Sequence, residues 1–440
     1  MSPVTDPREA PLPARKPSGF SNLVLHLHPK LVPAAALPLS RTFGLGGGAA
    51  VLFLILAVTG SLLLVVYEPS PERAHGTVTR LVDEVPFGAL VRNVHHWAAN
   101  GMVLVTLLHL LRVFYRGGHL PPRRGNWFAG VALLLLVVAC AFTGYLLPWD
   151  QLAFWAVTIA TGMLEYAPMV GGLLLRAARG GADVGPATLA RFFVLHVAIL
   201  PIAMLLLLAF HFWLVRKVGG VILPEGSGDR ASPRGALVPT SPNLTQREGA
   251  MALGVLAAVM VAAALWDAPL LAQANPGMSP NPAKAPWYFM GVQELLVHLH
   301  PAFGAVGVPL LGVVLLLALP ALGGRQPPTG RWFGSARGAR HALVAAAVGA
   351  VGTAALVVAN EPLRRAPPWL PGIPPAVRSG ALPLAAMAIL ILGTAWLSRR
   401  RGATRIESVQ SAFTFALASF GVLTLVGVFL RGQGMALVLP

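Results

Sequence analysis

The stretch "LVRNVHHWAANGMVLVTLLHLLRVF" (residues 90–114) places His95 and His109 in an apolar segment long enough to cross a lipid bilayer. The two histidines are 14 residues apart on one expected helix. At about 100° per residue, 14 steps return to within ~40° of the starting direction, so both imidazoles look out from one face, ~21 Å apart. Polar rings are costly in lipid, so the segment indicates a function for its histidines.

A second histidine pair lies in another apolar segment, "RFFVLHVAILPIAMLLLLAFHFWLVRK" (residues 191–217). His196 and His211 are 15 residues apart, and Pro201 between them can distort the helix enough to absorb the extra residue. One histidine from each helix at each of two depths gives two sets of opposed imidazoles, which suits haem irons lying between the helices. A proton relay also uses histidines in lipid, but it has no need of matched depths on two helices.

Two pairs of glycines repeat the histidine spacing. Gly46 and Gly60 lie in the first apolar segment, Gly130 and Gly144 lie in the third, and each pair is 14 residues apart. Each glycine is expected at the level of one histidine pair, where the missing side chain lets the backbone approach a flat macrocycle. The glycines therefore favour the haem interpretation of the histidines.

Arginines flank the histidines near the expected membrane interfaces. Arg92 and Arg112 are each three residues from a histidine, and Arg191 precedes His196 by five. Guanidinium groups at these positions suit the negative propionates of a haem. Basic side chains that snorkel at helix ends are the alternative explanation.

The composition excludes a soluble protein. Of 440 residues, 55% are hydrophobic and only 11% are charged. Because a lone segment in lipid must satisfy its own backbone, every span is expected to be helical, and we predict an all-α integral membrane protein. Nine runs have the length of a membrane span, at residues 43–66, 91–114, 127–147, 192–215, 249–267, 302–322, 340–359, 381–397 and 411–430.

The placement of charge orients the chain in the lipid bilayer. The net charge is +17, and the N-terminus with every second connection carries 21 basic against 6 acidic residues, whereas the other side carries 10 of each. This positive-inside pattern predicts a cytoplasmic N-terminus in the cell inner membrane and makes nucleic-acid binding unnecessary. The Pro-rich, charged residues 1–22 predict a disordered cytoplasmic tail without a cleavable signal peptide. The single Cys140 excludes a disulfide framework, a Cys-x-x-Cys-His haem attachment and a cysteine-ligated cluster.

These features together resemble cytochrome b of the cytochrome bc-type quinol oxidoreductases. The resemblance rests on "RNVHHW" and "LLHLLR" around the first two histidines, on "FTGYLLPWDQLAFWAV" (142–157), on "TLARFFVLH" (188–196) and on the glycine pairs. The histidine spacing of 15 and the residues around "PWDQ" are similar to the photosynthetic-type branch, in which the haem-bearing bundle and the quinone-binding remainder are separate chains.

The resemblance implies that the two parts are fused in this chain. The expected order is a tail (1–22), a four-helix di-haem bundle (23–216), a Pro/Gly-rich cytoplasmic linker (217–247), a three-helix quinone-binding region (248–360) and two extra membrane helices (361–440). The extra helices are rich in Ala and Leu, and they either shape a partner interface or anchor the chain.

The resemblance also implies the cofactors. His95 with His196 would hold the lower-potential haem b near the outer face, and His109 with His211 the higher-potential haem b near the cytoplasmic face. A covalently attached further haem is not expected, because Gly44 stands where the photosynthetic branch has a cysteine.

Quinol oxidation is expected beside the outer haem, and quinone reduction beside the cytoplasmic one. The family's Pro-Glu-Trp-Tyr motif is altered, because Ala285 and Pro286 precede Trp287 and Tyr288. Glu294 is then the nearest carboxylate for accepting a proton, and a mostly apolar pocket would raise its pKa; a solvated position on a short interfacial helix is the alternative. The full expected sets are Phe142, Tyr145, Pro148, Trp287, Tyr288 and Glu294 for oxidation, and His28, Arg216 and Lys217 for reduction.

The implied activity is bifurcated quinol oxidation coupled to proton translocation, as one subunit of a respiratory or photosynthetic complex. Without cysteines for a cluster, the chain would need a Rieske iron–sulfur protein and a c-type cytochrome as partners, in a complex that is a homodimer by analogy. A di-haem anchor subunit of a quinone-linked dehydrogenase is the alternative, although it predicts neither the "PWDQ" loop nor the added "PWYF" half. A transporter would predict inverted repeats instead.

Overall fold

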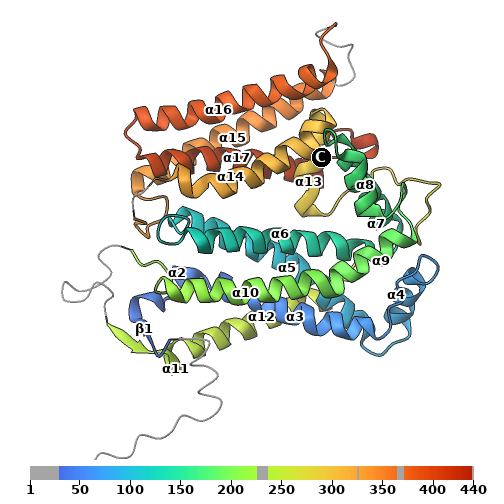
Figure 1. Ribbon diagram of the computed structural model, residues 1–440, viewed down its shortest axis with the longest axis horizontal. Helices are drawn as coiled ribbons and strands as arrows, with labels where there is room; N and C mark the ends of the chain where they lie inside the picture. Colours follow the sequence, from blue (N-terminus) through green and yellow to red (C-terminus); the bar gives the residue numbers. More distant parts are fainter. Residues whose placement is uncertain (1–28, 225–235, 325–326, 364–370, 439–440) are drawn as a thin grey trace, which may run out of the picture.

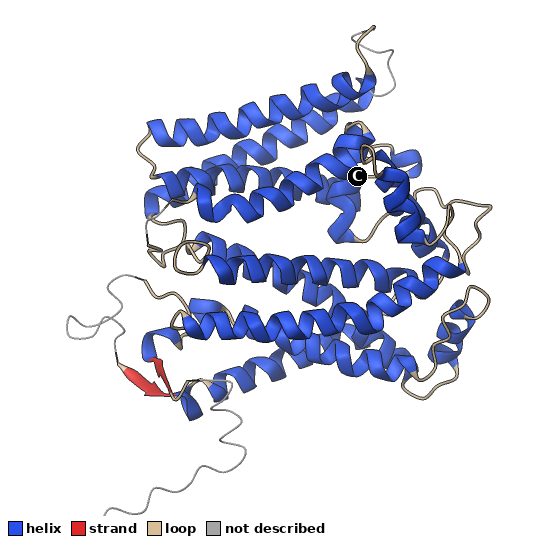
Figure 2. Ribbon diagram, in the orientation of Figure 1, coloured by secondary structure: helices blue, strands red, loops and turns tan. Residues whose placement is uncertain are grey.

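The structure is a computed structural model that describes residues 29–224, 236–324, 327–363 and 371–438. Within these ranges nine helices are long and apolar enough to cross a membrane, in agreement with the nine predicted segments. They run side by side in two groups (Figure 1), and helices account for nearly all of the regular structure (Figure 2). The chain is therefore an all-α integral membrane protein. The predicted tail and His28 lie outside the described residues.

The first group is a bundle built around the two histidine helices. It contains α3 (Leu45–Leu64), α5 (Gly88–Tyr115), α6 (Arg124–Leu146) and a continuous helix made of α9 (Pro186–Val194), η3 (Leu195–Ile199) and α10 (Leu200–Lys217). α3 packs along α5, and α6 packs along α10. Three short helices, α4 (Ala74–Asp83), α7 (Gln151–Gly162) and α8 (Gly171–Arg179), gather at one end of the bundle (Figure 1).

The fourth membrane helix widens by one residue at its first histidine. Residues Leu195–Ile199 form a π turn in which the N–H of Leu200 donates to the carbonyl oxygen of Leu195. Pro201 follows directly, and since proline has no N–H it cannot complete the ordinary α-helical ladder there. The π turn takes up the extra residue between His196 and His211, so the predicted distortion near Pro201 is confirmed.

The fifth membrane helix, α12 (Thr245–Leu265), belongs in space to the first group. It packs on α3 and α5, where Val259 and Ala263 join a buried cluster with Leu52 and Ala98. The turn after α12 is fixed to α5, because the Asn93 side chain bonds the backbone of Ala263 and Ala268 at 3.1 and 2.8 Å. The linker expected at 217–247 therefore does not coincide with the division between the two helix groups, because α12 follows the linker in sequence and packs on the first group.

The second group surrounds the last helix. Its elements are α13 (Trp287–His298), η4 (Ala302–Gly307), α14 (Val308–Leu322), α15 (Ala336–Leu363), η5 (Val377–Ala381), α16 (Leu382–Arg400), α17 (Arg405–Phe429) and η6 (Gln433–Met435). α17 packs on α13, α15 and α16. Small residues allow the close approach, since a Cβ on Gly349 would lie 2.6 Å from the carbonyl oxygen of Phe415. α17 is thus a core helix of this half, which its generic composition did not reveal.

A short two-stranded sheet joins the start of the described chain to the end of the linker. β1 (Leu31–Pro33) pairs antiparallel with β2 (Leu237–Pro239), and the Thr240 N–H donates to the carbonyl oxygen of Lys30 at 3.0 Å. η1 (Ala34–Ala36), α2 (Leu39–Thr42) and α11 (Thr240–Asn243) flank the pair. The three-residue strands are too short to be predicted from an alternating pattern.

Candidate functional site

His95 on α5 and His196 in the π turn face each other across the first bundle. Their ring centres are 6.2 Å apart, and the ring planes are inclined by 73°. Two metal–imidazole bonds of about 2 Å, with roughly 1 Å from each nitrogen to its ring centre, add to roughly 6 Å. The pair therefore fits one metal ion held between two axial imidazoles, as in a bis-histidine haem.

Hydrogen bonds within the chain fix both of these rings. The Thr59 hydroxyl lies 2.9 Å from His95 Nδ1, and the carbonyl oxygen of Cys140 lies 2.9 Å from His196 Nδ1. Because a carbonyl oxygen only accepts, Nδ1 of His196 carries the proton, and Nε2 retains the lone pair that a metal requires. The tautomer suited to ligation is thus set by the protein.

The second pair, His109 and His211, lies about four turns further along the same helices. The two side chains are close enough to interact electrostatically. Their Nδ1 atoms are buried without a hydrogen bond from the described residues, unlike those of the first pair. The two levels therefore share paired histidines and differ in the hydrogen bonds that support each imidazole.

Each predicted glycine faces one histidine. A Cβ built on Gly46 would lie 3.1 Å from Cε1 of His109, and on Gly60 it would lie 3.3 Å from Cε1 of His95. A Cβ built on Gly130 would lie 3.5 Å from Cε1 of His211, and one built on Gly144 would lie 2.3 Å from Cε1 of His196. At Gly144 any larger residue would displace the imidazole of His196, so the close approach of the backbone to this ring requires glycine.

The predicted propionate arginines are engaged with backbone carbonyl groups. Arg92 donates to the oxygens of Ala268 and Pro269, at 2.7 and 2.6 Å. Arg112 donates from Nε and Nη2 to the carbonyl oxygen of Arg41, at 3.1 and 2.6 Å. Arg92 and Arg112 flank the two histidine levels, which leaves a propionate role open to both.

Arg191 lies further from the ligands than its place in the sequence suggests. Its exposed guanidinium donates to the carbonyl oxygen of Ala177 on α8 and packs beside Gly180. Its contacts are therefore with the surface helix rather than with the interior of the bundle.

A cavity of about 340 Å³ lies beside the His95–His196 level, between α6, α7 and the start of α13. Phe142 and Tyr145 line it from α6, as expected from the sequence. The rest of the lining includes residues of the two segments expected to enclose a quinol, 149–188 and 282–296: Ala156, Ile159, Ala160, Met163, Ala283, Ala285, Pro286, Phe289, Val292 and Gln293. The side chains are apolar except for Tyr145 and Gln293, which is the composition of a site for an apolar ligand with few polar contacts.

Trp287 and Tyr288 point away from this cavity, into the seam between the two helix groups. The Trp287 indole donates to the side-chain oxygen of Asn100 on α5 at 2.8 Å, and both rings pack against a cluster that includes Val103 and Met204. Burial raises the pKa of Tyr288 to about 12. Neither ring is part of the cavity lining, and the same holds for Pro148.

Glu294 faces the opposite side of α13 and is fully buried in an ion-pair network. Its oxygens accept from Arg431 Nε at 3.1 and 3.0 Å, and His298 Nε2 lies 2.9 Å from Oε1. Arg431 also pairs with Glu361 at 2.8 Å. Burial alone raises the pKa of Glu294, but hydrogen bonds from His298 and Arg431 outweigh it and lower the pKa overall. The expected raised pKa is therefore wrong, because the carboxylate faces a guanidinium and not an apolar pocket.

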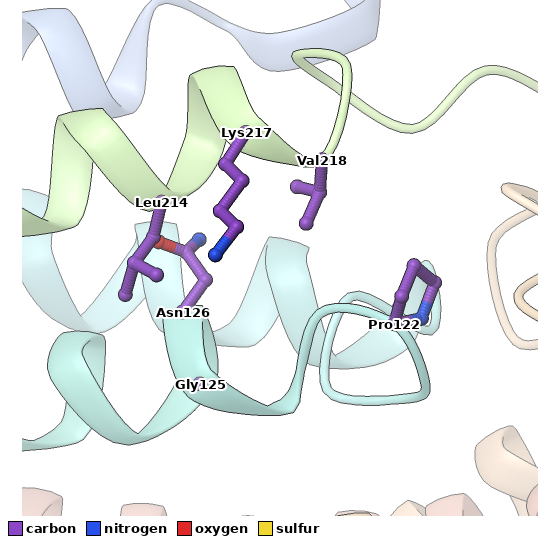
Figure 3. Close-up of a pocket in the computed structure, with 6 residues that line it drawn as sticks. All are labelled: Pro122, Gly125, Asn126, Leu214, Lys217 and Val218. Atoms are coloured by element: carbon purple, nitrogen blue, oxygen red, sulfur yellow. The ribbon is translucent and has the colours of Figure 1, made fainter.

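A second cavity, of about 380 Å³, opens at the other end of the bundle beside the His211 level. It is lined by Leu214, Lys217 and Val218 of α10 with Pro122, Gly125 and Asn126 before and within α6, and the Lys217 ammonium and Asn126 side chain converge in it (Figure 3). Lys217 was predicted for quinone reduction. Arg216, one residue earlier, is not part of this lining.

Gln293 is a residue that the sequence reasoning missed. Its side chain donates to the carbonyl oxygen of Ala283 at 2.6 Å and accepts from the N–H of Ala285 at 2.7 Å. These two hydrogen bonds hold the segment before Trp287 against α13, where Gln293 lines the first cavity. The sequence signal for Gln293 was its position directly before Glu294, which had been selected as a candidate.

A membrane bundle with two opposed histidine pairs, each backed by glycine, defines a class of haem-binding electron carriers, and comparisons with known proteins agree. The family model described as Cytochrome b/b6/petB matches residues 31–219. Cytochrome b6 of Heliobacterium mobile is 43% identical over 187 residues, covering 42% of this chain and 88% of that protein. Cytochrome b6 of Prochlorothrix hollandica is 43% identical over 175 residues, covering 40% and 79%. The chain therefore belongs to the cytochrome b/b6 family.

The likeness extends beyond the first bundle. The solved structure of a hyperthermophilic respiratory Complex III superposes with a TM-score of 0.61 at 25% sequence identity, covering 88% of this chain and 90% of that one. The cytochrome b6 relatives match less than half of this chain. The similarity of the second helix group to a known protein therefore rests on the solved structure.

Proposed function

We propose that the chain is the cytochrome b subunit of a quinol oxidoreductase. Two b haems would lie between α5 and the continuous helix α9–η3–α10, at the levels of His95 with His196 and of His109 with His211. The observation that carries the proposal is the first pair, whose ring centres are 6.2 Å apart. Both rings present the ligand tautomer, and Gly60 and Gly144 remove the side chains that would crowd them. Two histidines holding one iron would favour electron transfer over ligand activation.

The protein's own residues orient and space the cofactors. When bound, the haems supply one-electron transfer across the membrane. α5 carries one ligand of each level on a single unbroken helix, and the π turn brings the ligands of the other helix to matching depths. Gly46, Gly60, Gly130 and Gly144 would leave room for the haems beside the histidines.

The cavity between α6, α7 and α13 is the proposed quinol oxidation site. Its apolar walls suit a quinone ring and tail, while Tyr145 and Gln293 are the polar groups available for the ring oxygens. Quinone reduction is proposed at the other end of the bundle, where Arg216 and Lys217 end α10. His28 stays a prediction for that site.

The same proposal gives orientation and partners. The connections from α5 to α6 and from α16 to α17, which are among the basic ones, lie at the end of the molecule that carries α2 and β1 (Figure 1). This end is therefore proposed to be cytoplasmic in the inner membrane. A Rieske iron–sulfur protein would take one electron at the outer end, and a c-type cytochrome would follow it. Release of quinol protons at the outer side and uptake at the cytoplasmic side would build a proton gradient, in a complex proposed to be dimeric.

A di-haem anchor subunit would share the histidine pairs. It would have no need of a cavity that the second half of the chain closes at the outer level. Pro286, Phe289 and Gln293 come from that half, and they favour the quinol oxidoreductase.

The test is a haem count and redox titration of the purified chain and two ligand variants. We expect two low-spin b-type components in the reduced-minus-oxidised spectrum, and the loss of one component each in His95→Leu and His211→Leu. His96→Leu is the matched control, because His96 packs on Trp97 and contacts Asn100 instead of facing α10. One component or none in the wild type, or both components in the ligand variants, would overturn the proposal.

A further inference from the structure

The two histidine levels are unequal in the hydrogen bonds that support their ligands. On α6, His196 Nδ1 bonds the carbonyl oxygen of Cys140, four residues before Gly144, whereas His211 Nδ1 has no hydrogen bond from the described residues. The residues of α3 that precede the facing glycines differ as well. Thr59 precedes Gly60, whereas Leu45 precedes Gly46 and has no polar side-chain group.

The Thr59 hydroxyl has a defined direction. It donates to the carbonyl oxygen of Ile55 at 2.7 Å, so its oxygen is left to accept from Nδ1 of His95 at 2.9 Å. Thr59 is buried, which keeps water from replacing this contact. His109 at the other level has a buried Nδ1 without a hydrogen bond from the described residues.

A hydrogen bond that accepts from Nδ1–H makes the imidazole more basic and a stronger electron donor through Nε2. Stronger donation stabilises the more highly charged, oxidised metal, and therefore lowers the reduction potential. It also restricts rotation of the ring about its Cβ–Cγ bond.

We propose that Thr59 is a positioning residue that holds His95 through Nδ1 and lowers the potential of the haem bound between His95 and His196 relative to the haem between His109 and His211. The inference rests on the proposed function, because it requires haem at both levels. It assigns a distinct role to a threonine that contacts the ligand and not the cofactor.

The experiment measures both midpoint potentials in the purified, haem-loaded chain by spectroelectrochemistry, with electron paramagnetic resonance as a readout of ligand geometry. The His95→Leu variant identifies which potential belongs to this level. In Thr59→Val, which has nearly the same shape without the hydroxyl, we expect the reduction equilibrium at the His95 level to shift about tenfold, or ~59 mV upwards for one electron. The other potential stays unchanged as the internal control.

Two further variants separate the hydroxyl from its surroundings. Thr59→Ser keeps the acceptor and is expected to keep the wild-type potential. Thr353→Val makes the same chemical change at a buried threonine of α15 and is expected to shift neither potential. Loss of the His95-level haem in Thr59→Val with retention in Thr59→Ser also supports the positioning role.

The inference is overturned if Thr59→Val leaves the potential of the His95 level unchanged, shifts both levels equally, or is matched by Thr353→Val. Failure of the wild type to bind two haems is a different result, which refutes the proposed function itself.

Discussion

Replacing Arg431 with methionine is expected to leave the buried carboxylate of Glu294 without its guanidinium partner. The side chains of Arg431 and Glu294 are both fully buried, and the guanidinium also bonds Glu361 and the carbonyl oxygen of Met435, at 2.8 and 3.0 Å. Removing one partner of a buried ion pair costs about 3–5 kcal/mol. We therefore expect Arg431→Met to lower the free energy of unfolding by about 3–5 kcal/mol.

The assay is equilibrium unfolding in mixed micelles, followed by circular dichroism. Arg73→Met is the matched control, because Arg73 pairs with Glu68 at 2.9 Å with side chains that are 66% and 40% exposed, and loss of such a pair costs about 1 kcal/mol or less. Adding Glu294→Gln to Arg431→Met removes the unpaired charge and is expected to recover most of the loss. A cost for Arg431→Met no larger than that of the control, or no recovery in the double variant, would refute the reasoning.

Three other predictions concern the ligand backing, the cavity and pH. Gly144→Ala should abolish haem binding at the His196 level, because its Cβ would lie 2.3 Å from the imidazole, whereas Gly254→Ala, which meets nothing within 4 Å, should leave both haems in an absorption spectrum. Ala160→Phe should fill the outer cavity and suppress quinol oxidation in a steady-state assay with both haems retained; an unchanged rate contradicts the site. Because the pKa of Glu294 is lowered by folding, its carboxylate stabilises the fold above the ordinary pKa of 4.5, and this contribution is lost as pH falls through the lower folded value. The stability difference between wild type and Glu294→Gln should therefore shrink only in acid, as measured by unfolding at several pH values.

The depths of the four histidines were predictable because they follow from the 3.6-residue repeat of a single α-helix. Spacings of 14 and 15 fix the direction and depth of His95, His109, His196 and His211 on their own helices. Even the adjustment near Pro201 follows local backbone chemistry. The glycines were predictable for the same reason.

The surroundings of Glu294 were not predictable from local pattern. Its partner Arg431 is 137 residues away, and the choice between an apolar pocket and an ion pair depends on which segment packs on α13. In lipid, apolar faces give little information about packing partners, so α17 was indistinguishable from a simple anchor. The polar Ser419 of α17, which donates to the carbonyl oxygen of Gly349 on α15, was a local signal of this packing.

α5 runs from Gly88 to Tyr115 without a proline or a π turn, and it carries a ligand of each histidine pair. Such a helix fixes the distance between its two histidines, because stretching it would break consecutive backbone hydrogen bonds. With haems bound at both levels as proposed, the distance that an electron crosses between them would stay constant.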